Sequence, residues 1–438
     1  MKRSLLAVRD TMTPVTILEA VAHGPLGAVR SLGRLGIPVH VVDANPWAPA
    51  FFSRYRRGRF VRDVLGADPV EAVARLLEIG RASARRSILL PTTDDGALFV
   101  ASHAAALREA FVVVDVPPGL VRALCNKKEM HHLARRLGIP TAQAVFPRSR
   151  DEVLAFLDTA VFPVMLKGID GPRLQQRCGA RMFIVQDRNE LLEKYDALED
   201  AADPNLMLQE YIPGGDDTVW MFNGYFDARS ECLAGFTGKK IRQYPVHRGA
   251  TSLGICLRNA TVETMTRDFM KAIGYRGILD IGYRFDARDG LYKVLDVNPR
   301  IGATFRLFVA ENDLDVLRAM YLDMTGQPVP AASVPEGRKW IVEDHDLLSF
   351  LGHRGNGGFA LSEWARSMRG VREGAYFAAH DPLPLLAMCA NDARRALQRR
   401  RERDEGRRRQ HSFASMRLPR PDAAPPAHCG RREGPAGS

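Results

Sequence analysis

Two strand-like runs near residue 290 constrain the fold of this chain most strongly. Residues 277–286, "GILDIGYRFD", and residues 291–298, "LYKVLDVN", are rich in apolar and β-branched or aromatic residues. Asp289 and Gly290 stand between the two runs, and Asp-Gly between such runs is a hairpin signal. The sequence therefore predicts an antiparallel hairpin with acidic residues inside otherwise apolar strands.

The register of this hairpin decides what its acids can do. If residues 288–290 form a three-residue loop with glycine in the left-handed conformation, Asp280 lies opposite Asn298 and Asp296 opposite Gly282. Side chains two apart on a strand share a face, so two carboxylates and one amide converge. Mg²⁺ takes such oxygen ligands, and unpaired carboxylates among apolar neighbours are costly without a cation. The pattern favours a cation site, with a surface hairpin carrying its polar residues outward as the alternative.

Phosphate-binding groups are expected around this face. Pro299 holds Asn298 extended, and Arg300 then offers a planar fork suited to phosphate or carboxylate. Lys167 ends the strand-like run 161–168 and is a compact donor for phosphate oxygens. A lysine at a strand end is more often only solvated, so Lys167 gains weight through the other features.

A glycine-rich linker connects two further predicted strands, 205–213 and 218–227. Its sequence "QEYIPGGDD" can present backbone groups to the edge of a flat heterocycle. Asp216 or Asp217 then lies within reach of a pair of sugar hydroxyls. The alternative is an ordinary turn rich in glycine and aspartate.

The N-terminal part has the pattern of a doubly wound α/β domain. A strand at 16–21, a glycine-containing turn, a helix at 28–36 and a strand at 37–43 form a β-α-β opening. Further strands are predicted within 87–95 and 111–117, and ligands of such sheets bind at the carboxyl ends of strands. The acids at these ends, alternatively helix caps or turn residues, are Asp43, Asp94 and Asp95.

Further elements follow. A single helix is predicted over 121–138, a strand over 181–187, a helix from Arg188 and another over 261–274. Residues 237–254, "TGKKIRQYPVHRGATSLG", are polar and basic and are predicted to form a loop.

The basic charge of the chain is concentrated at its end. Thirteen arginines and five acids follow from Arg394 onward, which accounts for +8 of the net charge of +11. The basic balance therefore gives no evidence that the folded body binds nucleic acid. The tail is too poor in apolar residues to fold. It could bind nucleic acid or an anionic surface, but a solvated tail is favoured.

Cysteine usage and hydropathy exclude several classes. No cysteines form close-spaced pairs, which argues against a zinc site and a disulfide framework. No apolar run reaches the ~20 residues that span a bilayer, and the N-terminus lacks a signal-peptide core. A cytoplasmic protein is expected. The six cysteines are Cys125, Cys178, Cys232, Cys256, Cys389 and Cys429.

The order of these features resembles the ATP-grasp superfamily, and within it the carboxylate–amine ligases similar to D-aspartate ligase. The resemblance rests on "NKKEMHHLARRLGIPTAQ", "FPVMLK", "LMLQEYIPGGDD", "GILDIGYRFD" and "YKVLDVNPRIG", in that order. It covers roughly residues 120–327, and "NPR" after an acidic strand is its most specific part. The β-α-β opening resembles the pre-ATP-grasp domain of these enzymes.

The resemblance implies a role for each matching residue. The two nucleotide-binding lysines match Lys127, with Lys128 as a possible register error, and Lys167, which touches the phosphates. The adenine-facing acid matches Glu210, with backbone contacts from Tyr211 and Ile212, and the ribose-binding acid matches Asp216, with Asp217 nearly as good. The Mg²⁺ ligands match Asp280, Asp296 and Asn298, and Arg300 matches the arginine that steadies the phosphoryl group or acyl phosphate.

Two departures from the family pattern are present. Asp296 stands where the family usually has glutamate, so the metal geometry must tighten. The glycine-rich loop over the phosphates is replaced by "IDGPRLQQRCGA", residues 169–180. Only Gly171 and Gly179 remain there. Either nearby arginines replace the backbone donors to phosphate, or the loop reads another substrate. These arginines are Arg173, Arg177 and Arg181.

The fold implied is a pre-ATP-grasp Rossmann-like α/β domain, 1–118, followed by an α+β ATP-grasp domain, 119–327. The latter has subdomains at 119–205 and 206–327, before a small extension, 328–392, and a disordered tail, 393–438. The predicted activity uses ATP and Mg²⁺, or Mn²⁺, to activate a carboxylate as an acyl phosphate and join it to an amine. The substrate-binding candidates in or near the loop 237–254 are Lys239, Arg242, His247, Arg248 and Arg306.

Two rival interpretations stay open. The chain could be an ATP-binding regulatory or scaffold protein of the same fold without turnover, or its tail could be the functional part. The partners expected are small-molecule acid and amine substrates. The sequence does not determine the oligomeric state, for which a homodimer is one candidate.

Overall fold

The computed structural model describes residues 6–20, 22–246, 249–334, 336–355, 360–394 and 397. The chain divides into two units, Met1–Met388 and Cys389–Ser438, and the three sheets described below all belong to the first. The predicted mixed α/β architecture is confirmed. Of the predicted tail, 393–438, only residues 393, 394 and 397 are among the described ones.

The N-terminal sheet has five parallel strands in the order β3-β2-β1-β4-β5. Its buried, nearly all-apolar strands are what a parallel sheet covered on both faces requires. Thr93, and not Asp94 or Asp95, caps the helix after β4 by accepting from the Gly96 amide. The elements are β1 (Val15–Leu18), α1 (Gly24–Gly33), β2 (Val39–Asp43), η1 (Pro49–Phe52), β3 (Gly58–Val61), α2 (Pro69–Arg81), β4 (Ser87–Pro91), α3 (Asp94–Ser102), α4 (Ala104–Leu107) and β5 (Phe111–Val112).

The single helix expected over 121–138 is wrong, because two helices occupy this stretch. They are α5 (Pro118–Cys125) and α6 (Lys127–Arg136). Asn126 has extended backbone angles, and its side chain accepts from the Lys128 and Glu129 amides as an N-cap. The cap starts a new helix and makes Lys127 its first residue.

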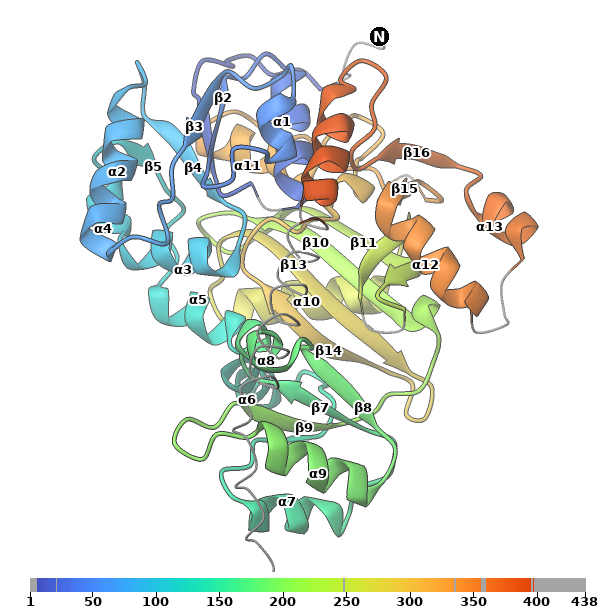
Figure 1. Ribbon diagram of the computed structural model, residues 1–438. Coiled ribbons are helices and arrows are strands. Elements are labelled where there is room, and N and C mark those ends of the chain that lie inside the picture. Colours follow the sequence, from blue (N-terminus) through green and yellow to red (C-terminus); the bar gives the residue numbers. More distant parts are fainter. Residues whose placement is uncertain are drawn as a thin grey trace, which may run out of the picture. The chain divides into compact units, whose positions relative to one another are not determined.

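A four-stranded antiparallel sheet follows, in the order β6-β9-β7-β8. One face packs on α7 and α9 through a core that includes Val164, Leu166 and Leu208, as Figure 1 shows at the lower end of the view. The elements are β6 (Ala144–Val145), α7 (Arg150–Leu157), β7 (Val164–Gly168), α8 (Gly171–Cys178), β8 (Met182–Val185), α9 (Arg188–Leu198) and β9 (Leu206–Glu210).

The third sheet has seven strands in the order β14-β13-β10-β11-β12-β15-β16. Strands from the predicted extension, 328–392, thus complete a sheet whose first strands belong to the predicted ATP-grasp domain, 119–327. The proposed domain boundaries stay predictions. The elements are η2 (Asp216–Thr218), β10 (Val219–Phe226), β11 (Cys232–Tyr244), β12 (Ala250–Cys256), α10 (Ala260–Ala272), β13 (Gly277–Asp286), β14 (Leu291–Asn298), η3 (Phe305–Leu307), α11 (Val316–Met324), β15 (Lys339–Ile341), α12 (Glu343–Gly355), α13 (Leu361–Ser367) and β16 (Val371–Gly374).

The loop expected over 237–254 is wrong, because most of it lies in β11 and β12. These strands pair with each other, and β11 also pairs with β10. Gly235, Gly238 and two adjacent lysines give β11 little intrinsic strand preference. Its hydrogen-bonded neighbours on both sides impose the extended conformation.

The predicted register of the acidic hairpin is confirmed, although its predicted loop is not. Asp280 pairs with Asn298 and Gly282 with Asp296. The loop has four residues, 287–290, with Gly290 at φ +73°. A bulge between the Gly282 and Tyr283 pairs then shifts the register by one residue, which offsets the longer loop.

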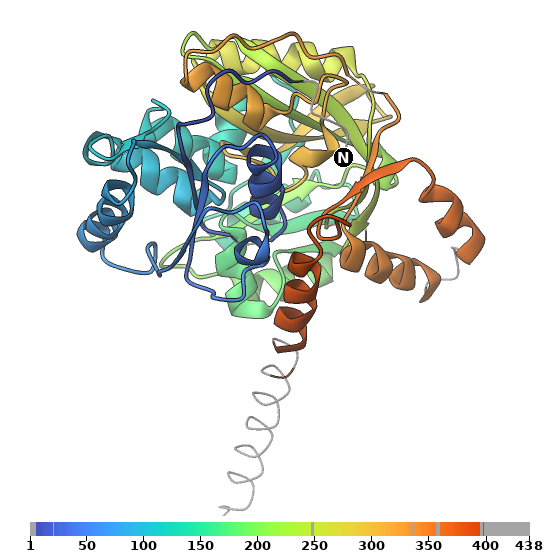
Figure 2. The same cartoon turned by 90° about the horizontal axis from the view of Figure 1, so that it is seen from above.

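One core joins the N-terminal sheet to the seven-stranded sheet. It includes Val29 of α1, Phe236 of β11, Phe305 and Trp340. Figures 1 and 2 show α1 beside α11, and buried residues of both helices belong to this core. Within the described ranges, no helix has the length and apolar character needed to cross a membrane.

Candidate active site

The acidic face of β13 and β14 brings three predicted metal-binding side chains together. The Asn298 side-chain amide lies 3.3 Å from Asp296 Oδ2 and 3.5 Å from Asp280 Oδ2. Asn223 on the neighbouring β10 donates to Asp280 Oδ1 at 2.8 Å. Asn223 was not anticipated, because its position opposite Asp280 follows only from strand pairing.

Two glycines make room for these carboxylates. A Cβ on Gly302 would lie 2.5 Å from Asp280 Cγ, and one on Gly282 would lie 2.6 Å from Asp296 Oδ1. The pKa of Asp280 is raised to about 6. Burial is the main cause, Arg300 opposes it, and the charge of Asp296 adds to it. Two close carboxylates with an amide oxygen form a donor set that fits a hard divalent cation.

Arg300 links this face to the N-terminal sheet. Its Nε donates to Asp94 Oδ1 at 2.7 Å, and its terminal nitrogen lies 3.2 Å from Asn298 Oδ1. Asp43, in contrast, accepts from the Ala20 and Asn45 amides and serves as a turn residue. Of the strand-end acids singled out in the sequence, Asp94 is the one in contact with the site.

The predicted lysines face the same acids. Lys127 Nζ donates to the Ile169 carbonyl at 3.2 Å; burial lowers its pKa, while Asp296 and Asp170 counteract this. Lys128 instead lies over the Phe146 ring at 5.7 Å, which favours Lys127 in the register left open by the sequence. Burial, with a smaller contribution from Lys127, lowers the pKa of Lys167 to about 8.

Two further cations were missed in the sequence. Lys240 of β11 donates to Gln243 Oε1 at 3.1 Å and to the Gly249 carbonyl at 2.8 Å. Burial lowers the pKa of Lys240, and the negative charges of Asp296, Asp216 and Asp280 oppose this effect. The Lys240 ammonium group therefore lies near all three acids. Arg284 of β13 lies over the Tyr211 ring at 5.9 Å and lowers the pKa of Lys167 through its charge.

Glu210 does not share a face with Lys167. Lys167 pairs with Met207 and Met165 with Gln209, so the buried Gln209 lies on the Lys167 face and Glu210 on the opposite one. The Glu210 carboxylate accepts from Lys293 Nζ and Arg288, each at 3.1 Å. The adenine-facing role of Glu210 stays a prediction, and Gln209 is the polar residue that shares the face of Lys167.

The linker after β9 supplies the remaining expected nucleotide contacts. Ile212 is buried, and Tyr211 faces Arg284. Asp216 accepts from the side chain of Gln243 at 2.8 Å and lies near the charge of Lys240, whereas Asp217 is exposed. The structure therefore favours Asp216 over Asp217 for a contact within the site.

Residues 169–180 contain the helix α8, Gly171–Cys178, in place of a glycine-rich loop. Asp170 caps α8 by accepting from the Arg173 amide, and Gly179 ends it at φ +80°. Arg173 pairs with Asp203 at 2.7 Å, Arg177 lies 3.4 Å from the Glu199 carbonyl, and Arg181 donates to Gln175. All three partners lie within residues 119–205. The structure therefore does not favour these arginines as replacements for phosphate-binding amides.

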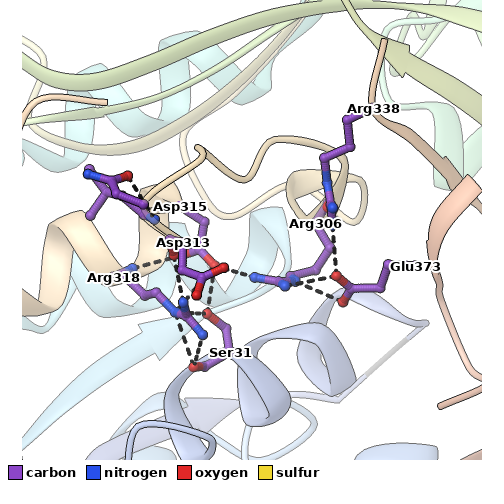
Figure 3. A network of polar contacts seen from close by, with 9 residues as sticks. Ser31, Arg306, Asp313, Asp315, Arg318, Arg338 and Glu373 are labelled. Atoms are coloured by element: carbon purple, nitrogen blue, oxygen red, sulfur yellow. Dashed lines mark hydrogen bonds and ion pairs between the residues drawn. The ribbon is translucent and has the colours of Figure 1, made fainter. Parts of the chain in front are cut away.

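Two of the three substrate-binding arginines expected from the sequence, Arg242 and Arg306, are buried in structural ion pairs. Arg306 is 5% exposed and points between Asp315 and Glu373, as Figure 3 shows. Arg242 is 3% exposed and binds both carboxylate oxygens of Asp346, at 2.8 and 2.9 Å. Lys239 lies 6.0 Å from the Trp220 ring, and His247 and Arg248 lie outside the described residues.

Comparisons with known proteins find one relative in sequence and several in structure. No family model matches it. D-aspartate ligase from Enterococcus faecium is 24% identical over 267 residues, which are 57% of this chain and 62% of that protein's length. The chain thus matches less than two thirds of this curated relative.

Solved structures resemble this one across most of the chain. N5-carboxyaminoimidazole synthetase from Staphylococcus aureus, complexed with ADP, has a TM-score of 0.59 at 11% identity, covering 81% of this chain and 88% of the other. L-amino acid ligase from Bacillus licheniformis has a TM-score of 0.54 at 15% identity, with coverages of 72% and 75%. The chain is therefore similar in sequence to D-aspartate ligase and has the ATP-grasp fold of carboxylate–amine ligases, with an N-terminal Rossmann-like domain.

Proposed function

We propose that this protein is an ATP-dependent carboxylate–amine ligase that releases ADP and phosphate. The observation that carries the proposal is that lysines and carboxylates from separate elements lie close enough for their charges to interact. Lys127 lies on α6 and Lys167 on β7 of the four-stranded sheet. Asp280 and Asp296 lie on β13 and β14 of the seven-stranded sheet, and the charge of Asp296 acts on both lysines. Such a set suits a polyphosphate held with a divalent cation.

Each group has a distinct proposed task. Asp280, Asp296 and Asn298 would hold Mg²⁺ or Mn²⁺, which when bound neutralises the phosphate oxygens. Lys127, Lys167 and Lys240 would bind the phosphates. Gln209 and the backbone at Tyr211 and Ile212 would contact the base, and Asp216 the sugar.

The reaction proposed has two steps. A substrate carboxylate attacks the γ-phosphoryl group and becomes an acyl phosphate, and an amine then displaces the phosphate to form an amide. Arg300, held by Asp94 and Asn298, would orient the carboxylate and bind its developing phosphoryl group. The protein contributes positioning and electrostatic stabilisation, so no nucleophilic side chain is needed.

The similar proteins indicate the class of substrate. One is a D-aspartate ligase and another an L-amino acid ligase, which supports an amino acid as the acid, the amine or both. ATP as the nucleotide is supported by the neighbour complexed with ADP. The acid and amine joined by this chain are left for experiment.

A coupled ADP-release screen tests the proposal. Purified protein is offered Mg-ATP with pairs of L- and D-amino acids and small carboxylates, and products are read by mass spectrometry. Asp296→Asn should lower turnover at least about 100-fold, whereas the exposed Asp158→Asn should not. Absence of Mg-ATP binding, or full turnover in Asp296→Asn, would contradict the ligase function.

One observation supports a second candidate, an ATP-binding regulatory protein of the same fold. The segment that covers phosphates in similar ligases is the short helix α8 here. If this helix prevents closure over the phosphates, the protein binds Mg-ATP tightly and releases no ADP with any acid and amine in the screen.

A further inference from the structure

A cluster of unpartnered polar atoms lies beside the N-terminus of α1. Of the nine side-chain nitrogen and oxygen atoms that are buried without a partner in the described part of the chain, four belong to His23, Asp344 and His345. They are both ring nitrogens of His23, Asp344 Oδ1 and His345 Nδ1. Buried polar groups are nearly always hydrogen-bonded, so this concentration indicates a ligand that supplies the missing partners.

The three residues lie together among aromatic rings. The His23 ring centroid is 6.5 Å from that of His345, and His345 Nε2 is 3.6 Å from Asp344 Oδ2. The ring of Trp340 lies 5.2 Å and that of Tyr376 5.9 Å from His23. The ring of Tyr244 lies 5.6 Å from His345. We call these six residues the imidazole cluster.

The other two acids in the first turn of α12 are already engaged. Glu343 accepts from the Tyr376 and Phe377 amides, and Asp346 is paired with Arg242. Asp344 is therefore the acid of this first turn with an oxygen available. Burial, with a smaller contribution from His345, lowers the pKa of His23 to about 3, so His23 is neutral at physiological pH.

The cluster is near the expected reaction centre. His23 precedes Gly24, and a Cβ on Gly24 would lie 3.0 Å from Ala303 Cα. Ala303 follows Gly302, the residue against which the Asp280 carboxylate packs. A ligand at the cluster is thus next to the loop that leaves the acidic face and carries Arg300.

Resting on the proposed ligase function, we propose that the imidazole cluster binds the amine co-substrate and that His345 accepts its proton. A carboxylate oxygen and aromatic faces suit an arriving ammonium group. With Nε2 oriented toward Asp344, the neutral tautomer of His345 leaves Nδ1 as the acceptor. His23 offers one further acceptor and one donor, which fits a nitrogen that both donates and accepts hydrogen bonds.

The transfer step balances with these groups alone. The amine nitrogen forms a bond to the acyl carbon, and the bond from that carbon to the phosphate oxygen breaks. Its electron pair leaves with phosphate. His345 Nδ1 takes one proton as the arriving ammonium becomes a free amine, and the second proton of the nitrogen leaves with the phosphate as hydrogen phosphate. Asp344 is a positioning residue, because it acts by orienting His345 and by attracting the ammonium form.

Hydroxylamine separates the two half-reactions. It is small and largely unprotonated at neutral pH, so it traps an acyl phosphate as a hydroxamate without the cluster's base. The variants are His345→Asn and Asp344→Asn, with His103→Asn, at the residue that follows α3, as the control for imidazole loss. Hydroxamate and amide formation are measured for each acid that turns over, with the L- and D-amino acids as amines.

Amide formation should fall at least about 100-fold in His345→Asn, the scale of a lost general base. Hydroxamate formation should stay within about twofold of the wild type, which also shows that the variant is folded. The deficit in amide formation should shrink as the pH rises, because more free amine is present, and a purely structural defect would not behave this way. Asp344→Asn should raise the KM for the amine.

The outcomes against the proposal are distinct. Unchanged amide formation in His345→Asn overturns the amine site and leaves the ligase function standing. Wild-type protein that forms hydroxamate but no amide with any amine also contradicts the amine site. Wild-type protein that forms neither product contradicts the ligase function itself, and the amine site falls with it.

Discussion

Arg300 Nε donates a 2.7 Å hydrogen bond to Asp94 Oδ1, joining residues 206 positions apart in the chain. Asp94 opens α3 at the end of the N-terminal sheet, and Arg300 follows the acidic strand β14. The same guanidinium also lies 3.2 Å from Asn298 Oδ1 and from the Ile301 carbonyl. The N-terminal sheet therefore takes part in setting the orientation of the arginine.

We expect Asp94→Asn to lower ligase turnover about 10- to 100-fold, the range for partners that orient a site residue. The binding of Mg-ATP should change less than turnover, because Asp94 is hydrogen-bonded to Arg300 and its charge has only a small effect on Lys127. Coupled ADP release and calorimetric titration measure the two effects. Asp95→Asn is the matched control, since Asp95 is the next residue and is exposed. Equal losses in both variants would show that Asp94 has no specific role.

Gly302→Ala should weaken binding of Mg-ATP while leaving the fold intact. Its Cβ would lie 2.5–2.8 Å from the Asp280 carboxyl group, so the carboxylate must move. We expect about a tenfold or larger loss in affinity, measured by calorimetry, because metal sites tolerate little displacement of a ligand. Gly119→Ala is the control, since no atom lies within 4 Å of a Cβ there. Wild-type affinity in Gly302→Ala would remove Asp280 from the metal site.

The affinity for Mg-ATP should fall as the pH rises through about 8. Burial lowers the pKa of Lys167 to about 8, and phosphate binds its protonated form, so above this pH binding must also take up a proton. The logarithm of the affinity should then decline with a slope approaching about −1 per pH unit. In Lys167→Arg the side chain stays charged, and this decline should be reduced, as titrations at pH 7, 8 and 9 can show. An identical decline in both proteins would contradict a phosphate contact by Lys167.

His131 should make the protein less stable in mild acid. Burial, helped by His132 and Arg135, lowers the pKa of His131 to about 4, against about 6.5 in an unfolded chain. Its neutral form stabilises the fold fully above pH 6.5, and this stabilisation is lost as the pH falls toward 4. The free energy of unfolding should drop between pH 8 and pH 5 by no more than about 2 kcal/mol from this residue, because solvent screens part of the effect. Denaturant titrations of His131→Gln should show a drop smaller by that amount, whereas His103→Gln should retain it.

The sequence by itself determined the acidic hairpin and the register of its polar residues. Side chains alternate with a period of two, so the spacing of Asp296 and Asn298 alone put them on one face. The prediction of the Asp280–Asn298 pair held although the loop is one residue longer than expected, since a bulge compensates for it. The order of the lysine, linker and hairpin motifs was likewise sufficient to indicate the fold.

Only the tertiary structure decided which polar residues surround the site. Lys240 lies on a strand that its neighbours in the sheet impose on a locally loop-like sequence. Arg242 and Arg306 resemble substrate-binding residues in sequence, but acids more than fifty residues away, Asp346 and Glu373, pair with them. Partners of this kind are set by long-range packing, and no local pattern encodes them.

The same distinction separates Glu210 from Gln209. The family resemblance implied the acid, while strand pairing put the amide on the face of Lys167. The imidazole cluster is a further case, because His23 and His345 are 322 positions apart and meet only where α12 approaches the N-terminus of α1. Local spacing determines which side chains share a face, whereas packing between elements determines what that face meets.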